Sequence, residues 1–271
     1  MLSQKQEELL IVCGSGKRVK AMLGLNNKSN ETYLSIVLPA YNEEAVIKNT
    51  LDRVAEYLEG RYPSYKIIVV CDGCRDNTAK VAEETAKTNH KIQVLDRKIN
   101  MGKGFSVRQG CLVAKGNYVI FSDADLSTPI DEIEKLLKWL EEGYDIAIGS
   151  RALKESDIQI RQAWYRETMG KVFNLFVQTF AIKGIKDTQC GFKGFKKEVA
   201  RKIFQRQTIN GFGFDVEVLY IARMLGYSIK EVPVRWLNRA ASRVNPLTHP
   251  LQMLTDLIRI RLRGWKGAYE G

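Results

Sequence analysis

Two carboxylates stand one residue apart in the segment VIFSDADLSTP, at residues 119–129. Asp123 and Asp125 repel each other and lose hydration when a site closes around them, so a positive charge is expected between them. Carboxylates at this spacing, where a strand opens into a loop, can hold one hard divalent cation. Mg²⁺ typically takes one or two carboxylates and completes its shell with water and phosphate oxygens. The pair therefore predicts a metal that stabilises a diphosphate leaving group.

A solvated loop before a helix is the alternative interpretation of this segment. Thr128, Pro129 and Asp131 form a capping signal for the helix that follows. That signal accounts for the end of the segment and leaves Asp123 and Asp125 without a structural reason.

Alternating apolar and amphipathic segments must position the two aspartates. Strands are expected at 33–39, 66–71, 91–95, 117–123 and 145–150, with helices after Asn42, which would cap the first, and at 76–87, 105–114 and 131–142. Short connections between them predict parallel βαβ units covered by helices on both faces. Ligands bind outside the carboxyl ends of such strands. The segments AYNEE, DGCRDNT, SDADLSTP and SRALKESD should therefore converge on one edge of the sheet.

The second half of the chain has a different pattern. A long apolar helix is expected at about 161–182, then a Gly-rich stretch at 184–195, a helix at 215–225, a short strand at 227–234 and a final helix. We divide the chain into a basic N-terminal extension (1–30), one α/β domain (31–235), and a basic loop with a C-terminal amphipathic helix (236–271).

The chain is basic, with a formal net charge of +11. Residues 235–266 carry seven Lys and Arg residues against Asp256 alone. An anionic partner is expected: nucleic acid, a membrane surface or a phosphorylated substrate, unless the charge is only a solvated surface. No recognised nucleic-acid module occurs, so we expect no nucleic acid partner. Because neither a run of ~18 apolar residues nor a signal-peptide core is present, we expect a cytoplasmic chain.

Five cysteines, an odd count, indicate a reducing compartment. Cys71 and Cys74 have CxxC spacing, but a structural zinc site usually needs four ligands and no second pair follows. A redox pair and a simple turn both remain open, and the position of CDGC after a strand favours the turn.

Five short segments occur in a fixed order: LSIVLPAYNEE, DGCRDNT, NMGKG, FSDADLSTP and GSR. This series resembles the family 2 inverting glycosyltransferases of GT-A fold. The segments DTQCGFKGFKKEVARKIF, GFGFDVEVLYIA, EVPVRW and PLQMLTDLIRIRLR make it most similar to the dolichyl-phosphate β-glucosyltransferases, with polyprenyl-phosphate mannose synthases more distant. The resemblance covers roughly residues 33–263. It implies an α/β, Rossmann-like, mostly parallel sheet, with a C-terminal amphipathic annex.

The resemblance also implies a donor site. By family position, the nucleoside side is lined by Pro39, Ala40, Tyr41 and Glu43; Val70 and Asp72 meet the base; and Asp123, Ala124 and Asp125 hold the ribose-diphosphate region with Mg²⁺ or Mn²⁺. The chain departs from the family at Cys71, where an acidic residue is frequent, and at Ser127, where related mannose synthases often have Gln. Both departures lie inside the implied site.

Basic residues are expected to neutralise the remaining phosphate charge. Arg151 can pair bidentately with phosphate, and Arg239 and Arg243 lie in a loop that we expect to close over the diphosphate. By family position, Arg166 faces the acceptor phosphate. Lys103 either supports the NMGKG turn or contacts the donor.

The catalytic requirement depends on the acceptor. A hydroxyl acceptor needs a general base, for which Asp215 or Glu217 are candidates. A lipid monophosphate has a second pKa of ~6, so it is already a substantially ionised nucleophile near neutral pH. We hypothesise that Asp215 orients the sugar or the loops and is not an essential base.

The C-terminal helix is expected to carry an apolar face. Leu251, Leu254, Ile258, Leu262 and Trp265 share one side, and the helix with Val172, Phe173, Phe176, Val177 and Phe180 could join it. Core packing would explain both faces, but the basic charge favours peripheral contact with the cytoplasmic face of a membrane.

The leading interpretation is a metal-dependent transfer of glucose from UDP-glucose to a dolichyl or polyprenyl phosphate. Transfer of mannose from GDP-mannose, transfer to a glycan hydroxyl, and binding of nucleotide sugars or nucleic acid without catalysis are the alternatives.

Overall fold

A computed structural model describes residues 32–160, 164–237 and 248–270 of the chain. The described residues form one compact unit. The sequence places Arg239 and Arg243 in the segment 238–247, and the N-terminal extension at 1–30; both lie outside the described residues.

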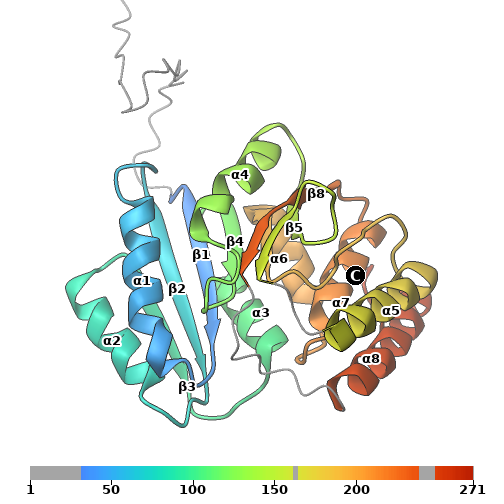
Figure 1. The fold of residues 1–271 in the computed structure, drawn as a ribbon, viewed down its shortest axis with the longest axis horizontal. Helices are drawn as coiled ribbons and strands as arrows, with labels where there is room; N and C mark the ends of the chain where they lie inside the picture. The colour runs from blue at the N-terminus through green and yellow to red at the C-terminus, as the bar shows by residue number, and fades with distance from the viewer. Residues whose placement is uncertain (1–31, 161–163, 238–247, 271) are drawn as a thin grey trace, which may run out of the picture. The chain divides into compact units, whose positions relative to one another are not determined.

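A seven-stranded sheet forms the centre of the unit (Figure 1), with the strand order β3-β2-β1-β4-β7-β5-β8. β1 pairs in parallel with β2 on one side and with β4 on the other. β5 and β8 also pair in parallel. The bounds are β1 Leu34–Ala40, β2 Tyr65–Asp72, β3 Ile92–Arg97, β4 Tyr118–Ser122, β5 Ile146–Ser150, β7 Phe192–Lys196 and β8 Ile229–Pro233. The mostly parallel α/β sheet is confirmed.

One strand of this sheet runs against the others. β7 pairs antiparallel with β4 and with β5, so it separates two strands that the sequence suggests as neighbours. The sequence predicts only a Gly-rich stretch here. It also gave no sign of the second sheet, in which β6 (Asp157–Ile160) pairs with β9 (Arg235–Leu237). Strand β7 has a direct consequence for the site, because it brings residues 187–193 beside the end of β4.

Helices cover both faces of the sheet, each over its own apolar cluster. Alternate residues of β1 show the division: Val37 belongs to one cluster, Ile36 and Leu38 to the other. One face carries α1 (Glu44–Leu58), α2 (Thr78–Thr88) and α4 (Ile133–Glu141), after the 3-10 turn η1 (Ile130–Glu132); the other carries α3 (Lys103–Val113), α6 (Lys197–Arg206) and α7 (Phe214–Met224). Burial on two faces explains why these strands are continuous apolar runs.

The predicted apolar stripe of α1 is confirmed, since Ile47, Leu51, Val54 and Leu58 are all buried. Its predicted cap is wrong. Glu43 is the N-cap, and Asn42 has a left-handed φ of 54° and accepts a hydrogen bond from the Arg75 backbone N–H. The helix start is thus fixed by the neighbouring turn, because the backbone N–H of Glu43 donates to Thr78 Oγ1 at 2.7 Å.

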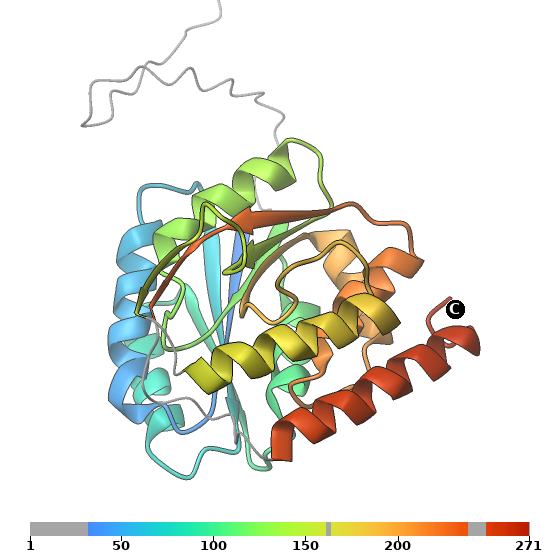
Figure 2. The ribbon, with the colours of Figure 1, turned by 45° about the vertical axis from the view of Figure 1, so that its right-hand side comes forward.

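Two helices lie side by side at one end of the unit: α5 (Trp164–Phe180) and α8 (Thr248–Trp265) (Figure 2). On α8, Ile258, Leu262 and Trp265 are exposed, so core packing does not explain these three positions. On α5 the face is divided, because Val177 is buried while Phe176 is exposed. Neither helix, nor any other in the described residues, is long and apolar enough to span a membrane.

Candidate active site

The end of β4 lies at the point where the strand order of the sheet reverses. From β1 the chain moves outward through β2 and β3, and it then returns to place β4 on the other side of β1. A parallel sheet opens a crevice at such a point, outside the carboxyl ends of the two strands. The sheet topology therefore brings Pro39 and Ala40, at the end of β1, next to Asp123, which follows β4.

Asp123 holds the ammonium group of Lys103. The Nζ of Lys103 lies 2.5 Å from Oδ1 of Asp123, and both side chains are part-exposed. Burial opposes the charged form of Lys103, but Asp123 and Asp215 outweigh it and raise the pKa of this lysine. A positive charge does lie beside the two predicted aspartates, and in this structure a side chain supplies it.

Asp125 is oriented by its own loop. Its two carboxylate oxygens accept hydrogen bonds from the backbone N–H and the hydroxyl of Ser127, each at 2.8 Å. Leu126 between them has a φ of 50°, which turns the chain sharply. The carbonyl of Ala124 accepts a 2.6 Å bond from the Thr50 hydroxyl. Ser127 thus supports Asp125 directly.

Gly191 allows β7 to approach Asp123 closely. A Cβ atom added to Gly191 would lie 2.1 Å from Oδ2 of Asp123, so no larger residue fits without moving that carboxylate. The backbone N–H of Asp123 also donates to the carbonyl of Gly191 at 3.2 Å. The segment before β7 is therefore a wall of the site.

Lys193 is a fully buried cation that the sequence analysis missed. Its Nζ lies 2.5 Å from Oδ1 of Asp215 and donates to the Cys190 carbonyl at 2.7 Å. Burial raises the pKa of Asp215, and the charges of Lys193 and Lys103 partly offset this. Asp215 is therefore held in an ion pair.

The alternative base, Glu217, has a structural role. Its carboxylate accepts hydrogen bonds from the backbone N–H groups of Thr208 and Ile209, and from the hydroxyls of Thr208 and Tyr269. All of its bonds hold the loop after α6 and the C-terminal end. The loop in turn contacts the Lys103 turn, because the Gly104 N–H donates to the Asn210 carbonyl at 2.7 Å.

Arg151 is engaged by a residue that the sequence analysis did not single out. Its Nε and Nη2 atoms donate to the two oxygens of Asp187 at 2.7 and 2.9 Å. Burial alone would raise the pKa of Asp187, but Arg151 outweighs it and lowers this pKa to about 2. Asp187 is itself positioned by Glu231, which accepts its backbone N–H. For Arg151 to contact a phosphate as predicted, its guanidinium would have to share its donors between Asp187 and the phosphate, or leave Asp187.

Asp72 supports the turn that carries Lys103. Its carboxylate accepts the backbone N–H groups of Met101 and Gly102, at 2.9 and 2.7 Å. Gly102 has a φ of 101°, and a Cβ there would meet the Asn210 carbonyl at 2.5 Å. Val70, by contrast, is fully buried and packs against the core near Gly110.

The remaining predicted residues are placed less completely. Tyr41 and Glu43 are half-buried in the turn after β1. Arg166 belongs to α5, and its side chain lies outside the described residues, as do Arg239 and Arg243. The residues missed by sequence reasoning, Asp187, Gly191 and Lys193, all come from the Gly-rich stretch. The available signal was a lysine within the apolar run CGFKGF.

A family model described as "Glycosyl transferase family 2" matches residues 35–204, which is more than half of the chain. The chain belongs to glycosyl transferase family 2. The match spans β1 to α6 and therefore includes Asp123, Asp125, Arg151 and Lys193.

Three similar proteins are each named dolichyl-phosphate beta-glucosyltransferase. The protein of Dictyostelium discoideum is 35% identical over 269 residues, which cover 95% of this chain and 82% of that protein. The Drosophila melanogaster protein is 39% identical, covering 88% and 77% respectively. The human protein is 36% identical with the same coverage.

Solved structures show the same fold. Glucosyl-3-phosphoglycerate synthase of Mycobacterium tuberculosis, solved with Mn²⁺, UDP and glucosyl-3-phosphoglycerate, has a TM-score of 0.63 at 20% identity. The similarity covers 86% of this chain and 81% of that one. This confirms the GT-A-like, Rossmann-like α/β architecture expected for a family 2 glycosyltransferase.

The family 2 site fits a hard divalent cation. It offers two carboxylates at the end of β4, and one of them already binds an ammonium group. No cluster of three His, Cys, Asp or Glu side chains suited to a metal occurs in residues 32–160, 164–237 and 248–270. A cation here would therefore complete its shell with water and donor phosphate oxygens, as Mg²⁺ and Mn²⁺ sites of this kind do.

Proposed function

We propose that the chain transfers glucose from UDP-glucose to a dolichyl or polyprenyl phosphate, with inversion at the anomeric carbon. The observation that carries this assignment is the similarity to dolichyl-phosphate beta-glucosyltransferases, at 35–39% identity over most of the chain. The site supports it, because Asp123, Asp125 and Lys103 meet in the crevice that a parallel sheet offers to a nucleotide.

The donor diphosphate would lie over the two aspartates. Asp123 and Asp125 are the residues that would hold Mg²⁺ or Mn²⁺, which when bound neutralises charge on the departing diphosphate. When the donor binds, the ammonium group of Lys103 would leave Asp123 and pair with a phosphate oxygen. Asp72 would keep the Lys103 turn in place through the N–H groups of Met101 and Gly102.

In the reaction, an oxygen of the lipid phosphate forms a bond to the anomeric carbon. The bond from that carbon to the diphosphate breaks, and its electron pair leaves with UDP. A phosphate monoester is already largely ionised near neutral pH, so no proton must be removed first. Asp215 acts as a fixed carboxylate held by Lys193, and catalysis rests on positioning and charge neutralisation.

Two polar atoms in the segment before β7 would bind the transferred sugar. Thr188 Oγ1 and Gln189 Nε2 are buried and have no hydrogen-bond partner among the described residues. An unsatisfied buried polar group costs about 1–3 kcal/mol. Both residues lie between Asp187 and Gly191, the latter against Asp123. Sugar hydroxyls would satisfy these atoms in the donor complex.

The acceptor lipid places this reaction at a membrane surface. We propose peripheral attachment at the cytoplasmic face through α5 and α8, whose exposed apolar residues include Leu175, Phe180 and Trp265. An amphipathic helix with basic residues and a terminal Trp is typical of interfacial binding.

A thermal-shift comparison with UDP and GDP, each with and without Mn²⁺, tests the donor. Ligand at ~100 times its Kd should stabilise the protein by ~2.7 kcal/mol. We expect a metal-dependent shift with UDP only, which Asp125→Asn abolishes and Asp131→Asn, at an exposed position of the turn η1, retains. The second step is transfer from UDP-glucose to polyprenyl phosphate in vesicles. A shift with GDP only would replace the donor assignment by GDP-mannose, and absence of lipid glucoside despite UDP binding would refute the acceptor.

A further inference from the structure

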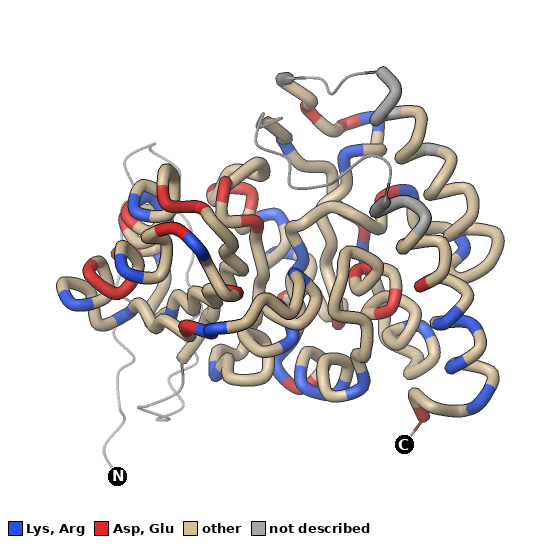
Figure 3. Tube along the Cα trace, turned by 90° about the horizontal axis from the view of Figure 1, so that it is seen from below, with Lys and Arg blue, Asp and Glu red and all other residues tan. Residues whose placement is uncertain are grey.

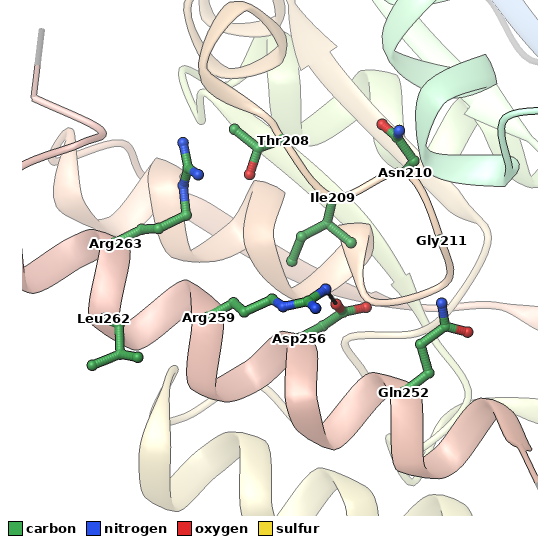
Figure 4. A pocket seen from close by; sticks show the side chains of 9 residues that line it. All are labelled: Thr208, Ile209, Asn210, Gly211, Gln252, Asp256, Arg259, Leu262 and Arg263. Atoms are coloured by element: carbon green, nitrogen blue, oxygen red, sulfur yellow. Dashed lines mark hydrogen bonds and ion pairs between the residues drawn. The ribbon is translucent and has the colours of Figure 1, made fainter.

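A pocket of about 570 Å³ lies between the loop after α6 and the helix α8 (Figure 4). Residues 208–211 line one side, and α8 lines the other with Gln252, Asp256, Arg259, Leu262 and Arg263. The pocket is separate from the donor crevice. Loop residue Asn210 turns its carbonyl toward Gly104, on the Lys103 side, while its neighbours line the pocket.

The charge of the pocket suits an anion. Arg259 and Arg263 stand one helical turn apart and both line the pocket; in Figure 4 the Arg259 side chain runs beside α8 to Asp256, and the Arg263 side chain extends away from the helix on the side of Thr208. Asp256 is the one acidic lining residue; it is buried, and its carboxylate lies 3.3 Å from Nη1 of Arg259. Since a guanidinium has five N–H donors, this single contact leaves most of the Arg259 fork available. Two cations against one carboxylate leave a net positive pocket.

The pocket borders an exposed apolar surface. Leu262 lines the pocket and is also exposed, together with Ile258 and Trp265 on the same helix. Trp265 is 71% exposed, and Leu175 on the adjacent α5 is 65% exposed. Figure 3 shows basic residues along the C-terminal helix α8. A cationic pocket next to an apolar face matches an amphiphile with an anionic head and apolar chains.

We propose that the pocket between loop 208–211 and α8 binds the phosphate head group of an anionic membrane phospholipid. Arg259 and Arg263 bind the phosphate oxygens, and the apolar face of α8 contacts the acyl chains. Because loop 208–211 also contacts the Lys103 turn through the Asn210 carbonyl, an occupied pocket fixes the orientation of the donor crevice relative to the bilayer. The lipid bound here is a docking ligand and does not react, so this inference is separate from the transfer reaction.

Flotation of the full chain with vesicles tests the proposal without requiring turnover. The vesicles contain phosphatidylcholine alone, phosphatidylcholine with phosphatidylglycerol, or phosphatidylcholine with polyprenyl monophosphate. We expect binding to the phosphatidylglycerol vesicles and at least about a 25-fold loss in Arg259→Gln/Arg263→Gln, because each substitution removes a charge-assisted hydrogen bond to the phosphate.

Two further variants separate the pocket from the general charge of the helix. Arg261→Gln/Lys266→Gln removes the same charge from the same end of the chain but does not alter the pocket lining. Gly211→Leu fills the pocket without a charge change, since a Cβ at Gly211 meets only Gln252, at 3.7 Å. We expect the first to retain most of the binding and the second to lose at least tenfold, with thermal melts showing that all variants fold.

The proposal would be overturned if Arg259→Gln/Arg263→Gln and Arg261→Gln/Lys266→Gln lost vesicle binding equally, or if Gly211→Leu bound as well as the wild type. Either result would leave only diffuse attraction between the basic residues and the anionic vesicle. Binding to polyprenyl monophosphate vesicles but not to phosphatidylglycerol vesicles would also overturn it, because the pocket would then serve the acceptor. Failure of glucose transfer, in contrast, would not change the flotation result.

Discussion

The ammonium of Lys193 and the carboxylate of Asp215 form an ion pair in which the lysine side chain is 0% and the aspartate side chain 3% exposed. The pair joins strand β7 to the first turn of helix α7, and the charge of Asp215 also helps to raise the pKa of Lys103. Taking two charges out of water is costly unless each satisfies the other, so this geometry makes the two residues dependent on one another.

Replacement of Lys193 by Met should destabilise the protein strongly. The variant leaves Asp215 buried without its closest cation, and breaking a buried pair from one side costs about 3–5 kcal/mol. Urea unfolding measures the loss. Lys196→Met is the control on the same strand, because its pair with Asp145 is part-exposed at 3.5 Å and should contribute under about 1 kcal/mol.

The double variant Lys193→Met/Asp215→Asn should recover part of the lost stability, since it removes both charges. If the double variant were less stable than Lys193→Met alone, the ion pair would not be the cause of the loss.

A methyl group at Gly191 should weaken nucleotide and metal binding with little effect on stability. The Cβ of Gly191→Ala would lie 2.1 Å from Oδ2 of Asp123 and must displace that carboxylate. Titration of UDP with Mn²⁺ by calorimetry should show at least a tenfold weaker Kd. Gly170→Ala on α5 is the matched control, because its added Cβ meets nothing within 4 Å apart from the backbone of its own helix and its chain neighbours. Unchanged UDP affinity in Gly191→Ala would show that Asp123 is not part of the donor site.

Asp187 should make stability depend on pH in the acid range. Its pKa is lowered in the folded state from 3.8 to about 2, chiefly by Arg151 acting against burial. A carboxyl group with a depressed pKa stabilises the fold at any pH above its pKa in the unfolded chain. This stabilisation is lost as the pH falls from about 4 to about 2. The shift corresponds to about 2 kcal/mol.

Unfolding free energies of the wild type and of Asp187→Asn, measured across this pH window, should converge as the pH falls. Asp52→Asn, which breaks an exposed pair with Lys48, should run parallel to the wild type. A constant difference between wild type and Asp187→Asn at every pH would contradict the assignment.

Cys74 should react faster with alkylating reagents than an ordinary thiol at neutral pH. A hydrogen bond from Cys71 lowers the pKa of Cys74, and the Asn42 backbone N–H and the Thr78 hydroxyl add to this, against the opposing effect of burial. The thiolate is the nucleophile, so the pH profile of iodoacetamide labelling should shift to lower pH. Mass spectrometry should find Cys111 and Cys190 slow, because both are buried.

Cys71→Ala should move the labelling profile of Cys74 back toward that of a free thiol, whereas Cys71→Ser retains a donor and should move it less. A wild-type profile that follows an ordinary cysteine would show that the two thiols do not share a hydrogen bond.

The regular elements were predictable because local pattern and burial agree. Strands β1, β2 and β4 are continuous apolar runs since both faces of the sheet are covered, and α1 shows its buried stripe directly. The short strand β7 was not predictable in this way. Its residues FKGFK contain two lysines and a glycine, and only pairing between β4 and β5 makes it a strand.

The candidate site likewise has features that the sequence predicts and features that it does not. The spacing of Asp123 and Asp125 after an apolar run, and the order of the motifs, depend on residue types that are readable along the chain. The partners of Arg151 and Asp215 could not be predicted from residue types along the chain, because Asp187 and Lys193 lie 36 and 22 residues from them in sequence. The sequence alone determined the alternating elements, the family and the carboxylate pair. Only the tertiary structure decided which charges neutralise one another, since ion pairs depend on distances of a few ångströms across strands that sequence order leaves apart.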